Sequence, residues 1–145
     1  MKAEVVAICC SKEKGEQKAP VTSAVFKEGF GIIGDAHAGN WHRQVSLLAQ
    51  ESIDKMRRKG LSLKDGDFAE NIVTRGIDLL ALPVGTGLAL GEVRLEITQI
   101  GKECHQRCAI YEQAGDCVMP KEGVFARVVT GGVLRAGDPI DPLVS

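Results

Sequence analysis

The sequence predicts a mainly β fold, arranged as a barrel or a folded-over sheet with a few short helices. Three observations favour this class. Most apolar segments are short and rich in β-branched residues, with Gly or Pro between them. The segment Val93–Thr98 alternates between apolar and polar residues, which is typical of a strand with one buried face. Seventeen glycines in 145 residues supply the turns that many short strands require.

The short apolar segments are predicted to be strands, and glycine-containing pairs mark the turns between them. The expected strands are Val5–Cys10, Val21–Phe26, Val45–Leu48, Phe68–Val73, Leu88–Leu90, Val93–Ile100, Val124–Val129 and Ile140–Val144. The expected turns are Thr86-Gly87, Leu90-Gly91 and Gly131-Gly132. The polar stretch Ser11–Lys18 is expected to form an exposed loop between the first two strands.

One helix is predicted from Gln50 to Lys59, and a second, short one from about Cys108 to Ala114. In the first helix Ile53 and Met56 are the expected buried positions, and Gly60 is well placed to end it. Cations near the carboxyl end of a helix complement its dipole. We therefore interpret the basic residues there as a solvated helix end and not as a nucleic-acid site; they are Lys55, Arg57, Arg58 and Lys59.

Length and charge place the chain among single-domain globular proteins. Of its residues 44% are apolar and 26% are charged, with 18 basic and 19 acidic side chains and a formal net charge of −1. One domain spanning residues 1–145 is expected from this length. The near-neutral charge and the few aromatic residues argue against a nucleic-acid partner, which requires phosphate-neutralising cations and stacking rings. No apolar run is long enough for a membrane-crossing helix.

Cysteine usage predicts a cytoplasmic protein with reduced thiols. The five cysteines are an odd number, and the apolar run Val5–Cys10 is too short for a signal peptide. A disulfide framework is therefore not expected. We interpret Cys9 and Cys10 as small buried residues within a strand.

The densest group of reactive side chains follows the predicted strand Val93–Ile100. Its three cysteines are Cys104, Cys108 and Cys117. Its neighbouring cationic or ionisable residues are Lys102, His105 and Arg107. Such neighbours stabilise a thiolate, the form that attacks electrophiles and binds soft metals. Zinc is the alternative, because Cys104, His105, Cys108 and Cys117 offer four ligands, although the last is a single cysteine instead of a second well-spaced pair.

A second candidate site is the glycine-rich segment Gly31–Gly39 with the basic residues that follow it. Glycines allow close approach of the backbone to a ligand, and successive N–H groups form an anion-binding concavity. An arginine can hold a phosphate through two parallel hydrogen bonds. The candidate residues here are Gly34, Asp35, His37, His42 and Arg43. The alternative is a simple turn in which Asp35 caps local N–H groups.

The sequence allows two roles for each of two further polar residues, Asn71 and Arg127. Asn71, beside Glu70, has an amide that can orient a ligand or satisfy the backbone of a neighbouring turn. Arg127 lies within a strand pattern, where it either faces outward or binds an anion.

Taken together, these motifs resemble those of the MOSC domain family, the module named after the C-terminal part of molybdenum cofactor sulfurases. The resemblance covers nearly the whole chain. The matching motifs are Gly34-Asp35-Ala36-His37 with Arg43–Leu48, Gly66–Ile72, Ile100–Cys108, Gly115–Pro120 through Arg127, and Gly137–Ile140.

The resemblance implies a barrel-like β fold and a role with the molybdenum cofactor in its molybdopterin form. It implies that Cys104 or Cys108 ligates molybdenum or carries transferable sulfur, with Cys117 as a further catalytic candidate. A soft thiolate suits the metal, Arg43 with the Gly34–Gly39 backbone suits the phosphate, and Asn71 is placed at the pterin edge. The other residues assigned to the cofactor are Asp35, His37, His42, Lys102, His105, Arg107 and Arg127.

The resemblance leaves two functions open. One is a cofactor or sulfur carrier, whose partners would be a molybdoenzyme and a sulfur donor. The other is a small reductase that takes electrons from a separate protein. Neither the pyridoxal phosphate domain of the fused sulfurases nor the additional N-terminal domain of the reductase relatives fits within 145 residues. A zinc-stapled interaction module is the third reading, and it predicts loss of the fold on chelation.

Overall fold

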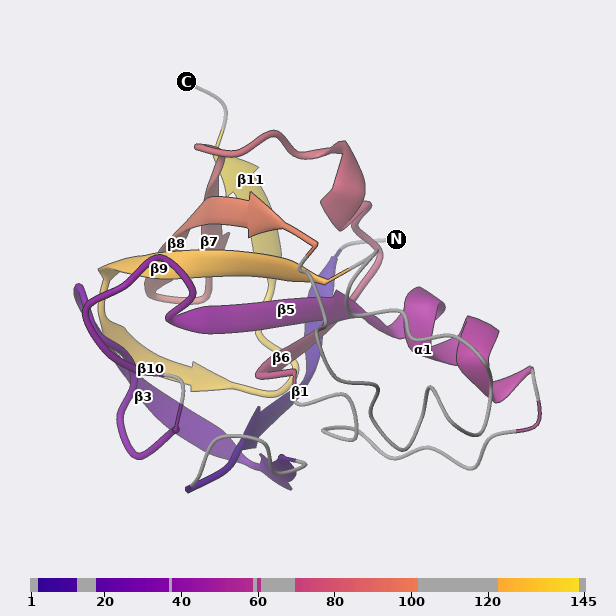
Figure 1. Cartoon of the computed structure of the whole chain (residues 1–145), viewed down its shortest axis with the longest axis horizontal. Coiled ribbons are helices and arrows are strands. Elements are labelled where there is room, and N and C mark those ends of the chain that lie inside the picture. The colour runs from indigo at the N-terminus through magenta and orange to yellow at the C-terminus, as the bar shows by residue number, and fades with distance from the viewer. Residues whose placement is uncertain are drawn as a thin grey trace.

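The computed structural model describes residues 3–12, 18–36, 38–58, 60, 70–101 and 123–143, which form two β-sheets and a short α-helix (Figure 1). The larger sheet has the strand order β11 (Ile140–Leu143), β7 (Gly87–Leu90), β8 (Val93–Ile100), β9 (Val124–Thr130), β5 (Val45–Ala49), β6 (Ile72–Arg75), β1 (Glu4–Cys10) and β2 (Ala19–Val21). The smaller sheet has the order β10 (Gly132–Arg135), β3 (Ser23–Lys27) and β4 (Gly31–Ile32). The helices are α1 (Gln50–Arg57) and the 3-10 turn η1 (Leu79–Ala81).

The mainly β class is confirmed, but the barrel-like arrangement is not. The edge strands β11 and β2 of the larger sheet are not paired with each other. The sheet comes nearest to closure at an isolated bridge between Glu4 and Pro139, where the Val5 N–H donates to the Asp138 carbonyl over 2.9 Å. A single bridge is not a strand ladder, so the sheet remains open. Each edge strand contains a proline, Pro20 in β2 and Pro142 in β11.

Two strand predictions are corrected where the chain passes between the sheets. The predicted strand Val21–Phe26 is divided at Thr22 into β2 and β3, which belong to different sheets. The predicted turn Gly131-Gly132 leads into a strand, β10, that the sequence did not indicate. A Cβ atom at Gly131 would lie 2.5 Å from the Phe26 carbonyl oxygen, so the crossing strands require glycine at this point.

The first predicted helix is confirmed as α1, with Ile53 and Met56 buried as expected. Gly60 follows it at φ +95°, a conformation that glycine adopts without strain. The second predicted helix lies outside the described residues, as do positions 68 and 69 of the predicted strand Phe68–Val73. Within the described ranges, no helix is long and apolar enough to cross a membrane.

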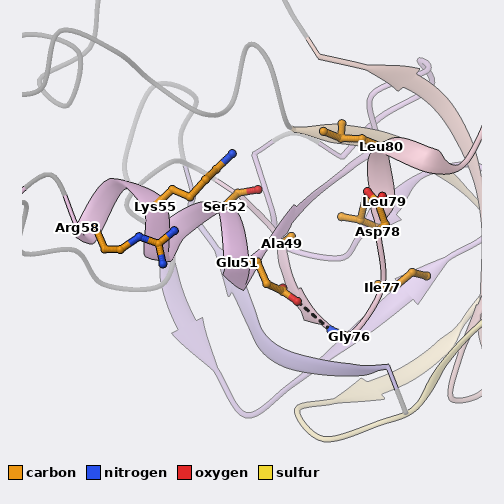
Figure 2. Close-up of a pocket in the computed structure, with 10 residues that line it drawn as sticks. All are labelled: Ala49, Glu51, Ser52, Lys55, Arg58, Gly76, Ile77, Asp78, Leu79 and Leu80. Atoms are coloured by element: carbon orange, nitrogen blue, oxygen red, sulfur yellow. Dashed lines mark hydrogen bonds between the residues drawn. The ribbon is translucent and has the colours of Figure 1, made fainter. Parts of the chain in front are cut away.

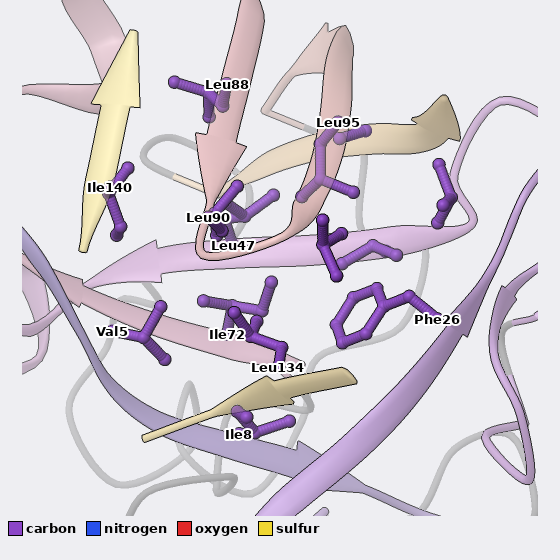
Figure 3. Close-up of a cluster of buried hydrophobic side chains, with 14 of the residues drawn as sticks. Val5, Ile8, Phe26, Leu47, Ile72, Leu88, Leu90, Leu95, Leu134 and Ile140 are labelled. Atoms are coloured by element: carbon purple, nitrogen blue, oxygen red, sulfur yellow. The ribbon is translucent and has the colours of Figure 1, made fainter. Parts of the chain in front are cut away.

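The core fills the space between the two sheets (Figure 3). Strand β8 shows how the sequence builds it: Val93, Leu95 and Ile97 are buried while Arg94 is exposed, as the alternation predicts. On β9 the core residues are Val124, Ala126 and Val128, so Phe125 and Arg127 point to the other face.

Strands β5 and β6 form the parallel pair of the larger sheet, and α1 lies between them in the chain. Ala49 at the end of β5 is opposite Thr74 near the end of β6. The carboxyl ends of both strands therefore lie at one edge of the sheet. The end of β8 and the start of β9 meet near the same edge, because Leu47 pairs with Val124 and Val124 with Ile100.

Candidate functional site

The loop from β4 to β5 folds against β8 and β9 on the face opposite the core. His42 is exposed, and its Nε2 lies 2.8 Å from the side-chain oxygen of Gln99. The Thr98 hydroxyl donates to the His42 carbonyl. Gln44, two positions after His42, is buried and accepts a hydrogen bond from the Val128 N–H over 3.0 Å. These bonds hold the predicted pair His42 and Arg43 against β8 and β9.

Arg43 contacts two aromatic rings. The central carbon of its guanidinium is 4.7 Å from the Trp41 ring centre and 5.6 Å from that of Phe125. Its Nε is buried and has no hydrogen-bond partner among the described residues. Stacking uses the flat faces of a guanidinium and leaves its in-plane N–H donors for an acceptor. We call Trp41, His42, Arg43, Gln99 and Phe125 the Arg43 cluster.

The Arg43 cluster lies beside the point where the chain enters and leaves residues 102–122. Gln99 precedes Gly101 by two positions, and Phe125 follows Gly123 by two. The Gly101 N–H donates to the Gly123 carbonyl over 2.6 Å, and the Gln99 amide donates to the Gly101 carbonyl over 2.7 Å. The predicted site residues of this stretch lie outside the described residues, as does His37; they are Lys102, Cys104, His105, Arg107, Cys108 and Cys117.

Asp35 makes its contacts in a different part of the structure from Arg43, and Gly34 beside it has φ +91° with open space at its Cβ position. Asp35 is buried and accepts from the Lys18 ammonium over 2.7 Å, and neither side chain is exposed to solvent. The same carboxylate accepts from the Ser11 N–H over 3.1 Å, and Lys18 also donates to the Ser11 hydroxyl over 3.1 Å. Asp35 therefore ties this loop to the end of β1. Lys18, expected in an exposed loop, is buried because it neutralises this carboxylate.

The buried ion pair affects the neighbouring thiol of Cys10. Burial, and then the Asp35 carboxylate, raise the pKa of Cys10 from 9.0 to about 11, with Lys18 acting in the opposite direction. Cys10 is half-buried and carries no disulfide. At neutral pH it is a thiol, consistent with its interpretation as a strand residue and not as a nucleophile.

Alkylation of Cys10 is expected to be about 100-fold slower in the folded than in the unfolded protein at pH 8, because the thiolate fraction falls about tenfold for each unit by which the pKa rises. The rate should increase as the pH approaches 11, since deprotonation then supplies the reactive form. Iodoacetamide labelling followed by peptide mass analysis measures both rates. Equal rates for the folded and unfolded protein at pH 8 would contradict the perturbed environment.

Asn71 is completely buried and joins β5 to β1. Its side-chain oxygen accepts from the Ser46 N–H over 2.9 Å and from the Ser46 hydroxyl over 3.2 Å. Its amide group donates to the Cys9 carbonyl over 3.1 Å. The sequence left two roles open for Asn71. In the structure its side chain satisfies backbone groups of β5 and β1. The expectation that Asn71 contacts a pterin is corrected, because the side chain is enclosed by these strands.

Arg127 faces outward from β9 and pairs with Glu96 of β8 over 2.8 Å. The hydrogen bond from Arg127 lowers the pKa of Glu96, and the same bond raises the pKa of Arg127. Both side chains are largely solvated, so this pair contributes little stability. Of the two alternatives for Arg127, the structure therefore supports the outward-facing one.

Sequence reasoning missed the aromatic contacts of Arg43 and the amide partner of His42. Trp41 lies two positions before Arg43, and an aromatic residue beside an arginine is a usable signal for stacking. Phe125 and Gln99 carry no such signal, because they reach Arg43 and His42 only through the pairing of β8 with β9. Among the described residues, no group of three or more His, Cys, Asp or Glu side chains is arranged to hold a metal ion.

Comparison with known proteins gives one family and a set of solved structures. The family model described as "MOSC domain" matches residues 34–141. The YuaD protein from Bacillus subtilis superposes with a TM-score of 0.81 at 19% identity, covering 98% of this chain and 96% of YuaD. YiiM from Escherichia coli gives 0.71 at 16% identity, covering 100% of this chain and 71% of YiiM. YiiM from Geobacillus stearothermophilus superposes with a TM-score of 0.71 at 19% identity, covering 98% of this chain and 75% of YiiM. No curated protein matches in sequence.

Proposed function

Because this chain belongs to the MOSC domain family, we propose that it binds the molybdenum cofactor in its molybdopterin form and acts in the delivery, sulfuration or use of that cofactor. The family is associated with the C-terminal domains of molybdenum cofactor sulfurases. The observation that carries the proposal is the position of the Arg43 cluster beside Gly101 and Gly123, which flank the segment with three of the five cysteines.

The residues of the Arg43 cluster fit an anionic group. The guanidinium of Arg43 makes cation–π contacts with two rings, and its Nε lacks a partner among the described residues. A phosphate oxygen is a strong acceptor for such in-plane donors. We assign the cofactor phosphate to Arg43, with the exposed His42 beside it. Asp35 and Asn71 are not part of this assignment, because their polar atoms bind other parts of the chain.

The thiols of the segment 102–122 complete the proposed site. A thiolate is a suitable ligand for a soft metal centre, and we assign this role to Cys104 or Cys108. The other cysteine of this pair, or Cys117, would tune the metal or resolve a persulfide. Lys102, His105 and Arg107 would favour the thiolate form. When bound, the cofactor supplies the metal at which redox chemistry or sulfur transfer takes place, whereas the chain binds and orients it.

Molybdenum binding is expected to depend on one cysteine of the segment. The protein is produced in a host that makes the cofactor, as wild type and as Cys104→Ala, Cys108→Ala and Cys10→Ala variants, and its metals are quantified. We expect near-stoichiometric molybdenum in the wild type and in the Cys10→Ala control, and its loss in one of the other two variants. Zinc in place of molybdenum would favour the zinc-stapled module. Molybdenum retained in every variant would refute the thiolate assignment.

The phosphate assignment is tested in the same preparation with Arg43→Gln and, as a control, Arg127→Gln, which removes the same charge from a solvent-facing pair. We expect Arg43→Gln to weaken cofactor retention about tenfold or more, the usual cost of losing a charge-assisted hydrogen bond to phosphate. Equal retention in the two variants would refute the assignment. Consumption of a reductant together with turnover of an organic substrate then distinguishes a reductase from a cofactor carrier, which would pass the intact cofactor to a partner protein without consuming electrons.

A further inference from the structure

A cavity of about 470 Å³ lies between α1 and the turn that follows β6 (Figure 2). It opens at the carboxyl ends of the parallel strands β5 and β6, since Ala49 ends β5 and Gly76 follows β6. In open α/β sheets ligands bind outside the carboxyl ends of parallel strands, and the cavity has the corresponding position at the parallel pair β5 and β6. The cavity shares no residue with the Arg43 cluster, so it constitutes a second candidate site.

The wall of the cavity that α1 forms carries two cations beside the Glu51 carboxylate. Lys55 and Arg58 line it, three positions apart and so on the same face of α1. Arg57, which pairs with Asp54 over 2.9 Å, does not line the cavity. The basic end of α1 is therefore divided between two environments, only one of which faces the cavity. The interpretation of this cluster as a purely solvated helix end does not account for that division.

The opposite wall combines an acidic side chain with an apolar surface. Asp78 is exposed and follows β6 in the same turn as Gly76. Figure 2 shows its carboxylate on the side of the cavity opposite Lys55 and Arg58. The apolar part of the lining is formed by Ala49, Ile77, Leu79 and Leu80.

The two walls are held together by a bond between them. Glu51 of α1 accepts a hydrogen bond from the Gly76 N–H over 3.2 Å, drawn as the dashed line in Figure 2. Leu79, which is buried in the core, anchors the turn that follows β6. These contacts give a cavity with cations at one side, an acceptor at the other and apolar surface between them.

We propose that this cavity binds a small phosphomonoester whose ring-sized body carries an amino group. The phosphate is held by Lys55 and Arg58, because two cations on one helix face match its charge. The body lies on Ile77 and Leu80, and the amino group donates to Asp78. A volume of about 470 Å³ exceeds what a lone phosphate fills and falls in the range of small-molecule sites. The inference is independent of molybdenum cofactor binding.

Adenosine 5′-monophosphate is a suitable probe, titrated into the metal-free protein and followed by ¹H–¹⁵N NMR. We expect saturable shifts of the amide signals of Gly76–Leu80 and of α1, with half-saturation below about 1 mM. Arg58→Gln should weaken binding about tenfold, because it removes a charge-assisted bond to the phosphate. The matched control is Arg57→Gln, which removes one charge from the same helix outside the cavity and should change the affinity less than about twofold.

Two comparisons test the remaining parts of the assignment. Adenosine, which lacks the phosphate, should bind at least about tenfold more weakly than the monophosphate. Asp78→Asn should reduce the preference for adenosine 5′-monophosphate over inosine 5′-monophosphate, whose ring lacks the amino group. Shifts confined to other residues, equal affinity for adenosine, or equal losses in the Arg57 and Arg58 variants would each overturn the proposal.

Discussion

Replacing Lys18 with methionine is expected to lower the free energy of unfolding by about 3–5 kcal/mol, the usual cost of leaving a buried charge without its partner. Lys18 and Asp35 are 2.7 Å apart, and neither side chain is exposed to solvent. Methionine keeps most of the side-chain volume but leaves Asp35 with only the Ser11 N–H among the donors described above. Urea unfolding followed by the fluorescence of Trp41, the single tryptophan, measures the change.

A double variant distinguishes loss of the ion pair from loss of packing. Lys18→Met combined with Asp35→Leu removes both charges, and we expect it to recover most of the stability lost in the single variant. The matched surface control is Arg127→Met, whose partner Glu96 is solvated and for which we expect a change below about 1 kcal/mol. A Lys18→Met effect no larger than this control would show that the pair is not a stabilising feature.

Replacing Asn71 with alanine is expected to lower the free energy of unfolding by about 2–5 kcal/mol. The substitution leaves the Ser46 N–H and the Cys9 carbonyl without their side-chain partner, and each unsatisfied buried group costs about 1–3 kcal/mol. The loss should include a decreased cooperativity between β5 and β1, since Asn71 contacts both. Urea unfolding gives the free energy, and amide exchange of Ser46 and Cys9 reports the local opening.

Ser46→Ala is the matched control for Asn71→Ala. It removes the hydroxyl that donates to the Asn71 side chain and accepts from the Asn71 N–H. It keeps the Ser46 backbone N–H that donates to the same side-chain oxygen and the Ser46 carbonyl that accepts from the Asn71 N–H. We therefore expect a smaller destabilisation, of about 1 kcal/mol. If Ser46→Ala proves as costly as Asn71→Ala, the effect belongs to packing at this position and not to the links made by the asparagine amide.

The parts of the fold that the sequence predicted are those set by local pattern. The alternation along β8 and the basic end of α1 before Gly60 are visible in a short window, and the structure has both elements. The strand β10 was missed because Gly131-Gly132 has the composition of a turn. Gly131, which precedes β10, is instead required by the Phe26 backbone, whose carbonyl oxygen is far away in the sequence but would lie 2.5 Å from a Cβ atom at this position.

The candidate site shows the same division between local and non-local information. Lys18 lies in a polar stretch, and its burial depends on a carboxylate seventeen positions away. Asn71 had two open roles because an amide has the same hydrogen-bonding groups in either. Arg43 was identified from its neighbours in the chain, whereas its contact with Phe125 depends on how β5, β9 and β8 are ordered in the sheet.

The prolines of the two edge strands have a consequence for self-association. An open sheet exposes unpaired backbone groups that can recruit the strand of another molecule, which is the starting point of aggregation and fibril growth. Pro20 in β2 and Pro142 in β11 have no N–H to donate, so an incoming strand would lack a ladder bond on either side. The two prolines thereby protect this open sheet against edge-to-edge polymerisation. A closed barrel would not need this protection, because it has no edge strands.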